Sequence, residues 1–238
     1  SNDNPNYIQF WPIVSEAWTL MGVEPILLYT GEQKLNLKGN VINFYSKNID
    51  SSFVAQNIRI LYPSLLDGNT CLVSDIDNLP LSKKYFINSV LDYENDSFII
   101  YRPDACPPNM ISMMWNAANS STWKEIFNID SERNIEKYLK KWYTKKYAIE
   151  GKAWYTDQIK LRKYVNKFSK KNKSRIVELD DTEMGFFRFN RNKLKKHINL
   201  INEIPNLEFT DFHMPRPFSE YEELINKVFE YHKKHIIK

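Results

Sequence analysis

Two carboxylates stand at alternate positions directly after a short apolar run. The run covers residues 71–73, and Asp75 and Asp77 follow it before Pro80 ends the extended segment. Oxygen ligands at the end of a strand suit a hard divalent ion such as Mg²⁺ or Mn²⁺, which keeps open positions for phosphate oxygens. An isolated Asp-x-Asp pair belongs more often to a solvated turn. Because an apolar strand precedes this pair, and α/β folds bind ligands at strand ends, the segment predicts a metal site.

Arg59 is a candidate positive partner for this acidic pair. It lies between Ile58 and Ile60 in the preceding segment, QNIRILYPSLL. A guanidinium on the preceding helix could hold Asp75 in place or bind a diphosphate, because its fork of donors matches both groups. The alternative is a surface arginine on an amphipathic helix. Its apolar neighbours in the sequence favour the functional interpretation.

A third carboxylate, Asp157, lies in the sequence AWYTDQ at the predicted start of a helix. Trp154 or Tyr155 could stack on the C–H face of a sugar, while the carboxylate accepts the proton of an acceptor hydroxyl. The alternative is a carboxylate that stabilises the N-terminus of its own helix through the helix dipole. The aromatic pair makes Asp157 the candidate catalytic base.

The sequence DFHMPRPF supplies His213 and Arg216 from an irregular segment bounded by prolines. His213 could complete a metal site of aspartate and histidine ligands with Asp77 and Asp75, and Arg216 could support the phosphates. A single histidine is more often an ordinary polar residue of a loop, so this ligand set stays a hypothesis.

The segment MMWNAANSSTWKE, residues 113–125, combines flat apolar faces with amide groups, as carbohydrate sites do. Trp115 and Asn116 are therefore candidate contacts to a nucleotide sugar. Tryptophans buried in a hydrophobic core explain the same pattern nearly as well.

Composition narrows the class of protein. The chain has 238 residues, 42% of them hydrophobic, and a net charge of +4, which is too small an excess to predict nucleic-acid binding. It contains only six glycines and no glycine-rich phosphate loop motif. The two cysteines, Cys71 and Cys106, form neither a disulfide framework nor a zinc spacing. With no run of eighteen apolar residues and no secretory signal, the sequence predicts a cytoplasmic protein without a membrane span.

Strand and helix patterns alternate over the first hundred residues, which favours an α/β fold with a mostly parallel sheet. Asn4 and Pro5 predict the start of a helix whose apolar positions recur through residues 10–21. The other predicted elements are strands at 23–29, 41–45, 71–73 and 97–101 and a helix at 52–66.

The second half of the chain predicts more helices than strands. Apolar positions indicate helices around 135–142 and 159–168 and a C-terminal helix through 221–229. Strands are expected at 176–179 and 185–189, joined as a hairpin around Asp180 and Asp181. Because no repeat or long linker separates these elements, residues 1–238 predict one domain.

Taken in order, the segments NPNYIQFWPIVSEAW, QNIRILYPSLL, SDIDNLPL and AWYTDQ resemble the GT-A nucleotide-sugar glycosyltransferases. The resemblance covers about residues 1–220. It is closest to the small chlorovirus and giant-virus enzymes that build capsid glycans, for which a cytoplasmic protein would act in the host cytoplasm. It implies a single GT-A domain with a mixed, mostly parallel central sheet, in which residues 1–110 hold the nucleotide and residues 111–238 meet the acceptor.

The same resemblance implies roles for individual residues. Asp75 would meet the ribose or the donor sugar, and Asp77 would bind the metal that bridges the diphosphate. The family's loop that contacts nucleobase and ribose matches residues 1–7, so Asp3 and Asn4 are candidate contacts there. Members of the family normally have an apolar strand before this loop, and the sequence here starts after it.

The leading hypothesis is therefore a glycosyltransferase that uses a UDP-sugar, Mn²⁺ or Mg²⁺, and a glycan or glycoprotein acceptor. Arg59, with Arg188 or Arg216, would add fixed positive charge to the diphosphate site. Asp157 would act as base if the anomeric centre inverts, or stabilise the sugar cation if it is retained. The alternatives are a nucleotidyltransferase that makes nucleotide sugars and a glycan-binding module of the same fold without catalysis.

Overall fold

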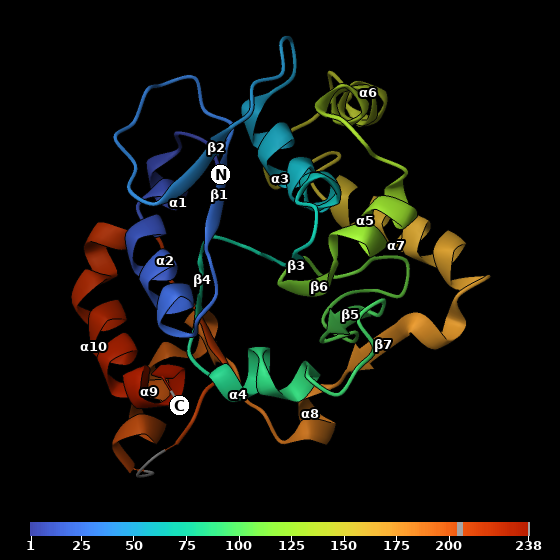
Figure 1. Ribbon diagram of the computed structural model, residues 1–238. Helices are drawn as coiled ribbons and strands as arrows, with labels where there is room; N and C mark the ends of the chain where they lie inside the picture. Colours follow the sequence, from blue (N-terminus) through green and yellow to red (C-terminus); the bar gives the residue numbers. More distant parts are fainter. Residues whose placement is uncertain (204–206, 238) are drawn as a thin grey trace.

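Short strands form the centre of the fold, and helices cover them on both sides (Figure 1). The structure is a computed structural model that describes residues 1–203 and 207–237. Within these residues the strands form a mixed α/β arrangement of three sheets. The predicted α/β class is therefore confirmed.

The largest sheet contains four strands in the order β3-β6-β5-β7. Their bounds are Thr70–Ser74 for β3, Phe98–Tyr101 for β5, Trp115–Asn119 for β6 and Ile176–Leu179 for β7. Strand β6 is antiparallel to both of its neighbours, whereas β5 and β7 are parallel. Because β6 runs opposite to the strand on either side of it, β3 and β5 share one direction.

Two smaller sheets complete the strand arrangement. Strands β1 (Ile26–Tyr29) and β2 (Asn40–Asn43) form a parallel pair. Strand β9 (Asp211–His213) lies between β4 (Asn78–Pro80) and β8 (Phe189–Asn190), antiparallel to β4 and parallel to β8. Three of the six strand pairings among the described residues are thus antiparallel, so the predicted mostly parallel sheet is wrong. The prediction missed β6, whose sequence reads as a ligand-binding segment.

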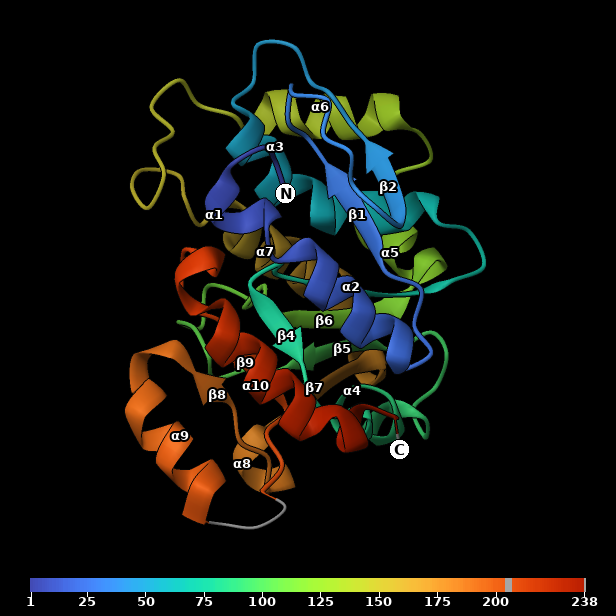
Figure 2. The ribbon, with the colours of Figure 1, turned by 90° about the vertical axis from the view of Figure 1, so that its left-hand side faces the viewer.

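One face of the strands is covered by helices from both ends of the chain (Figure 2). Helices α2 and α10 pack there in a core that includes Trp18, Phe86, Trp115 and Phe229. Asn4 caps α1 as predicted, because its side chain accepts a hydrogen bond from the amide of Asn6. The elements of this face are α1 (Pro5–Ile8), α2 (Trp11–Leu20), α4 (Lys83–Phe86), η2 (Asn88–Val90) and α10 (Phe218–Ile237).

The opposite face carries a second core, which includes Phe53, Ile58, Trp123 and Leu161. Asp50 caps the first helix of this layer by accepting from the amides of Ser52 and Phe53. The predicted helices at 52–66, 135–142 and 159–168 are confirmed here. The elements are α3 (Ser51–Leu61), η1 (Tyr62–Leu65), α5 (Ser120–Phe127), α6 (Glu132–Trp142) and α7 (Thr156–Ser169).

The predicted hairpin between residues 176–179 and 185–189 is wrong. A short helix, α8 (Asp181–Met184), follows β7 directly, and β8 joins a different sheet. Asp181 is the first residue of this helix, and its carboxylate pairs with Arg102. The remaining elements are η3 (Lys173–Arg175), η4 (Arg191–Lys193) and α9 (Leu194–Glu203).

No helix in residues 1–203 and 207–237 has the length and apolar character that crossing a bilayer requires.

Candidate functional site

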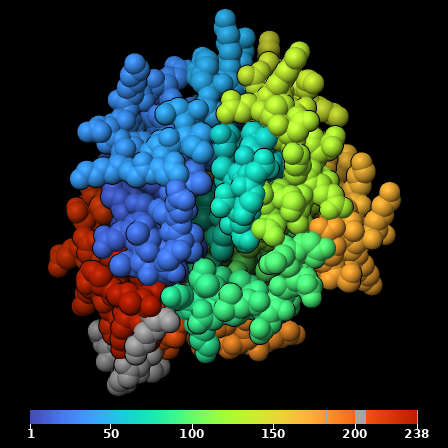
Figure 3. All heavy atoms as spheres, viewed as in Figure 1, coloured from blue at the N-terminus to red at the C-terminus, as the bar shows by residue number. Residues whose placement is uncertain are grey.

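A cavity of about 890 Å³ opens between the N-terminal part of the chain and helix α3. Figure 3 shows the hollow between residues near the N-terminus (blue) and the α3–η1 region (cyan). Most of the cavity runs along β1 and β3, and charged side chains gather where β3 ends. We refer to that part as the polar end, lined by Asn4, Tyr7, Arg59, Asp75, Asp77, Trp154, Asp157, Arg191, His213 and Arg216.

Arg59 joins two carboxylates that are far apart in the sequence. One guanidinium nitrogen, Nη1, donates to Asp75, and the other, Nη2, donates to Asp157 Oδ2 at 2.6 Å. Its Nε also donates to the carbonyl of Gln56 at 3.0 Å, which fixes the side chain against its own helix. Arg59 thus holds Asp75 in place, one of the two roles expected of it, and it also fixes Asp157.

Asp157 is nearly sealed from solvent, with its side chain only 1% exposed. It lies in the first turn of α7, and its Oδ1 accepts the backbone amide of Gln158 at 2.9 Å. Burial raises the pKa of this carboxyl above its usual value, and the charge and hydrogen bond of Arg59 only partly oppose that effect. Asp157 is therefore a better proton acceptor than an exposed aspartate.

Asp77 and His213 come together because β4 and β9 are paired, with Asn78 opposite His213. Nε2 of His213 lies 3.6 Å from Oδ2 of Asp77. Arg191 approaches the same oxygen at 3.0 Å and also donates to the carbonyl of Met214. Burial alone would raise the pKa of Asp77, but His213, Arg191 and Arg216 hold it below its usual value.

Asp77 and His213 suit two neighbouring ligands of one divalent ion. Two ligand atoms about 2.1 Å from an ion and at right angles to it lie roughly 3 Å apart, close to the observed 3.6 Å. Asp75 is turned to Arg59 instead. Among the residues that the structure describes, no three side chains of His, Cys, Asp or Glu gather as a ligand set. A metal held here by Asp77 and His213 would take its other ligands from substrate phosphates and water, as Mg²⁺ commonly does.

The rim of the polar end is formed by residues on two loops. Arg216 lies over the ring of Tyr7, with 4.8 Å from the guanidinium carbon to the ring centroid, and pairs with Glu150 at 3.6 Å. Trp154 stacks on Tyr147 with the ring planes 20° apart. The predicted residues Arg216 and Trp154 therefore both line the cavity, and Asn4 joins them from the start of α1.

Three of the predicted sugar or nucleotide contacts lie elsewhere. Trp115 and Asn116 are fully buried in β6 and do not line the cavity. Trp115 packs edge-on against Trp18 and Phe86, so the alternative of a core tryptophan is the one that the structure shows. Asn116 donates to the carbonyl of Ser112.

Asp3 points away from the cavity, and its carboxylate accepts the amide of Gln33 at 3.4 Å. Its backbone approaches Gly31 so closely that a Cβ there would lie 2.7 Å from the Asp3 nitrogen. Gly31 therefore allows the first residues to pack across the end of β1. This packing places Asn4, but not Asp3, at the site.

Arg188 does not reach the polar end either. Its guanidinium pairs with Asp211, with 3.0 Å from Nε to Oδ2, and also contacts Asn78 and Met114. Its positive charge is thus paired with Asp211 in the interior of the protein.

Sequence reasoning missed Tyr7, Arg191 and Tyr147. Tyr7 lies in the predicted first helix, and nothing in its sequence context marks it as a site residue. Arg191 begins the basic stretch that leads into residues 193–197, which is typical of a solvated surface. It reaches Asp77 only because β8 and η4 bring residue 191 alongside the end of β9.

No protein-family model matches the sequence, and no curated protein matches it significantly.

Proposed function

We propose that the protein is a metal-dependent glycosyltransferase that moves a sugar from a UDP-sugar to the hydroxyl of a glycan acceptor. The observation that carries the proposal is the composition of the polar end. Three aspartates, one histidine and three arginines from separate parts of the chain line one end of a cavity. Carboxylates for a cation, arginines for a diphosphate and a buried carboxylate for a proton are the groups that this reaction requires.

Asp77 and His213 are the residues that would hold Mn²⁺ or Mg²⁺. A bound metal supplies positive charge that neutralises the departing diphosphate. Arg191 and Arg216 add fixed positive charge on the same side of the cavity, and their side chains are already oriented by Met214 and Tyr7. Preorganised charge of this kind stabilises a transition state without further reorganisation.

Asp157 is the group that would take the proton of the acceptor hydroxyl. Its raised pKa favours proton acceptance, and Arg59 fixes the orientation of the carboxylate. Asp75 shares that arginine, so the two carboxylates are positioned together. In this arrangement Asp75 would accept hydrogen bonds from hydroxyl groups of the ribose or of the donor sugar.

Trp154, which stacks on Tyr147, gives the polar end an apolar wall. Sugars expose C–H faces that pack on aromatic rings, while their hydroxyl groups need carboxylate and amide partners. Both kinds of surface occur together here, which supports a sugar rather than a simple phosphate ester as substrate.

The test is a calorimetric titration of UDP into the protein with and without Mn²⁺, followed by turnover of a panel of UDP-sugars. We expect Mn²⁺ to strengthen UDP binding, and Asp77→Ala to abolish both that effect and metal-dependent turnover. Asp104→Ala is the matched control, because Asp104 is exposed and outside the cavity. UDP binding that is independent of metal would contradict the proposal, and release of pyrophosphate from a nucleoside triphosphate and a sugar phosphate would favour a nucleotidyltransferase.

A further inference from the structure

The charge of the protein is distributed very unevenly along the chain. Residues 131–175 contain fifteen lysines and arginines but only four aspartates and glutamates, a net charge of +11 in a chain whose total is +4. The rest of the sequence is therefore acidic, with a net charge of −7. The basic segment comprises α6, the loop at 143–155, α7 and η3. The small total charge thus hides one strongly basic part of the fold.

The basic side chains lie on the outer sides of α6 and α7. Each helix buries an apolar stripe in the second core. Residues four positions apart lie on the same side of a helix, and exposed basic residues recur at this spacing away from the buried stripes. They are Arg133, Lys137, Lys140 and Lys141 in α6, and Lys163, Lys167 and Lys170 in α7 and directly after it.

The basic sides of the two helices meet where α6 ends and α7 begins. The rings of Trp142 in α6 and Tyr164 in α7 lie 6.0 Å apart, and Lys160 approaches the Trp142 ring, with 5.7 Å from Nζ to the centroid. Burial, together with the positive charges of Lys163 and Lys141, lowers the pKa of Lys160. Lysines of both helices are thus close enough to repel one another. We call the surface that they form the basic face, made up of Lys137, Lys141, Lys160, Lys163 and Lys167.

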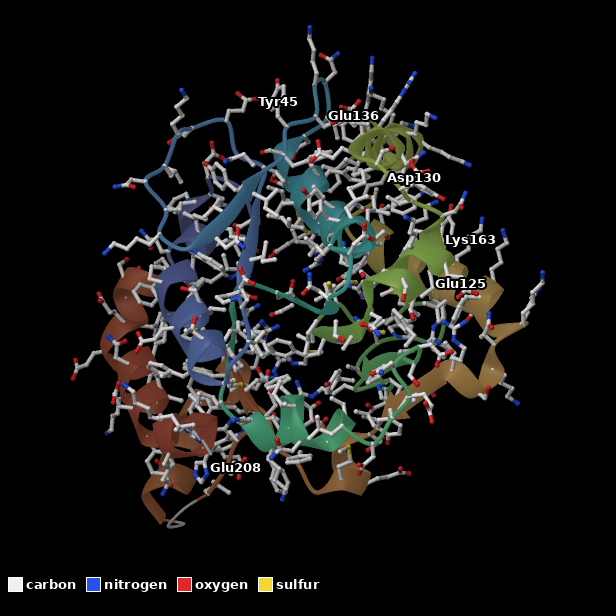
Figure 4. The ribbon with its side chains drawn as sticks, in the orientation of Figure 1. Tyr45, Glu125, Asp130, Glu136, Lys163 and Glu208 are labelled. Carbon is white, nitrogen blue, oxygen red and sulfur yellow. The ribbon has the colours of Figure 1, made fainter. Side chains whose placement is uncertain are left out.

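Few acids balance the charges of this side of the molecule. Of the twelve lysines in residues 131–175, Lys140 alone forms an ion pair with a carboxylate within the described part of the chain, with Glu136 at 3.0 Å. Glu125 of α5 is already paired with Arg175. Figure 4 shows side chains with nitrogen tips that extend outward along this side, where Lys163 is labelled near the periphery. A dense, unpaired positive surface of this kind attracts an extended anionic partner.

Exposed apolar side chains lie at one end of the basic face. Tyr155 is 50% and Ile159 43% exposed, and the amide of Ile159 donates to the carbonyl of Tyr155, which places them one helical turn apart. Lys163 continues the same side of α7 after one further turn. Ile149, 56% exposed, belongs to the loop that precedes Tyr155. Exposed apolar residues beside a lysine-rich surface are typical of proteins that lie on a lipid bilayer.

The composition of this region favours a bilayer over a nucleic acid as its partner. Twelve of the fifteen basic residues are lysines, whose charge is compact and strongly hydrated, whereas arginine is the preferred residue for binding nucleic-acid phosphates in a fixed geometry. The exposed apolar residues lie beyond the lysines rather than between them, where bases would stack. A bilayer surface requires only positive charge and apolar side chains that enter the headgroup region.

We propose that the basic face docks on the surface of an anionic lipid bilayer. The lysines of α6 and α7 lie against the anionic headgroups, while Ile149, Tyr155 and Ile159 enter the headgroup region. Ile149 also lines the cavity, together with Glu150 and Trp154, so docking brings the polar end close to the membrane surface. The docking needs no helix that crosses the bilayer, and it is independent of the reaction proposed for the polar end.

Sedimentation with lipid vesicles tests the docking. One set of vesicles contains phosphatidylcholine with about 30% phosphatidylserine, and vesicles of phosphatidylcholine alone are the neutral reference. We expect the protein to sediment with the anionic vesicles at about 50 mM salt and to be released at about 500 mM, because salt screens the attraction. It should not sediment with the neutral vesicles.

One triple variant removes three exposed charges from the basic face, namely Lys141→Gln, Lys163→Gln and Lys167→Gln. Because each basic residue near an anionic surface strengthens binding by about fivefold, the loss of all three should weaken binding to the anionic vesicles about 100-fold. The matched control removes the same charge from exposed positions around β2, with Lys34→Gln, Lys38→Gln and Lys47→Gln. It should weaken binding by less than about threefold, because these lysines lie outside the basic face.

The apolar contact is tested with Tyr155→Gln combined with Ile159→Gln, since neither residue lines the cavity. Binding to the anionic vesicles should weaken about tenfold, while its dependence on salt stays unchanged because no charge is lost. Melting curves followed by circular dichroism verify that every variant is folded. Binding as tight as that of the wild type would overturn the insertion of these two side chains.

Docking on the bilayer is overturned if anionic and neutral vesicles bind the protein alike, or if the basic-face variant and its control bind equally well. A duplex oligonucleotide of DNA or RNA is titrated in parallel. If the protein binds the duplex through the same three lysines and does not sediment with either kind of vesicle, the proposal is also overturned, because the partner is then a nucleic acid.

Discussion

Two regions of the molecule share one arrangement, an arginine between two aspartates. At the polar end, Arg59 lies between Asp75 and Asp157. In the core, Arg102 at the end of β5 lies between Asp181 and Asp211. The side chain of Asp75 is 35% exposed and faces the cavity, whereas that of Asp211 is fully enclosed. Only the first cluster is accessible to a substrate.

The two clusters also differ in the balance of charge. Asp211 is paired with Arg188 as well as Arg102, and together they hold its pKa below the usual value although burial alone would raise it. Asp157 shares its single arginine with Asp75, and burial raises its pKa. An aspartate that is paired with two arginines thus stays ionised and has a structural role. An aspartate that shares one arginine with a second aspartate keeps its affinity for a proton. This difference separates a structural cluster from a candidate catalytic one.

The largest effect is expected from Asp157→Asn. The amide retains the size of the side chain but cannot accept the proton of an acceptor hydroxyl, so kcat should fall by about 10²–10⁴-fold. UDP binding should change little, because Asp157 is assigned to the acceptor. Single-turnover kinetics and UDP titration measure the two effects separately. With Asp104→Asn as the control, an Asp157→Asn enzyme of unchanged kcat would show that the Arg59 cluster is structural, like the Arg102 cluster.

The next effect concerns the core cluster. Arg102→Met leaves Asp211 with Arg188 alone, and breaking a buried ion pair in this way typically destabilises a protein by about 3–5 kcal/mol. Urea unfolding followed by circular dichroism measures the loss. Arg59→Met is the matched variant, and it should be less destabilising, because Asp75 can be solvated from the cavity and the buried Asp157, whose pKa is raised by burial, can take up a proton. Equal losses in the two variants would remove the distinction between the clusters.

The free energy of unfolding, measured as a function of pH, tests the difference between Asp157 and Asp211. The pKa of Asp157 is raised on folding, so its contribution to stability is complete below its unfolded pKa of about 3.9 and is lost as pH rises through the folded pKa. The free energy of unfolding of the wild type minus that of Asp157→Asn should therefore fall over this window. Its slope should not exceed about 1.4 kcal/mol per pH unit. A difference that grows with pH would mean that Asp157 resembles Asp211, whose pKa is lowered.

The sequence predicted the local parts of this structure better than its long-range pairings. Helix periodicity located α3, α6, α7 and α10, because an amphipathic stripe is a property of one segment. Strand β6 lies in a segment that was interpreted as candidate sugar contacts, and the antiparallel pairing of β4 with β9 joins residues more than a hundred positions apart. Neither could be derived from periodicity alone.

The candidate site shows the same limit. Asp75, Asp77 and Asp157 could be selected because each follows or begins a recognisable element. Trp115 has the same chemistry as a sugar-binding tryptophan, and only its place in the middle strand pair decides that it is core. Nothing in the sequence marks Arg102 or Arg191 as important. Each is distinguished only by the carboxylate that the fold places beside it, Asp211 and Asp77 respectively.

The smallest effect is expected in a third cluster of this type, on the surface. Arg175 pairs with Asp96 at 2.9 Å and with Glu125 at 2.8 Å, and the side chains of these acids are 58% and 49% exposed. Glu125 lies on the outer side of α5 at the periphery of the molecule (Figure 4). Because exposed ion pairs are solvated and screened, Glu125→Gln should change the free energy of unfolding by less than about 1 kcal/mol, and added salt should reduce even that. Urea unfolding at low and high salt measures both quantities. A loss as large as that of Arg102→Met would mean that burial does not set the order of the three clusters.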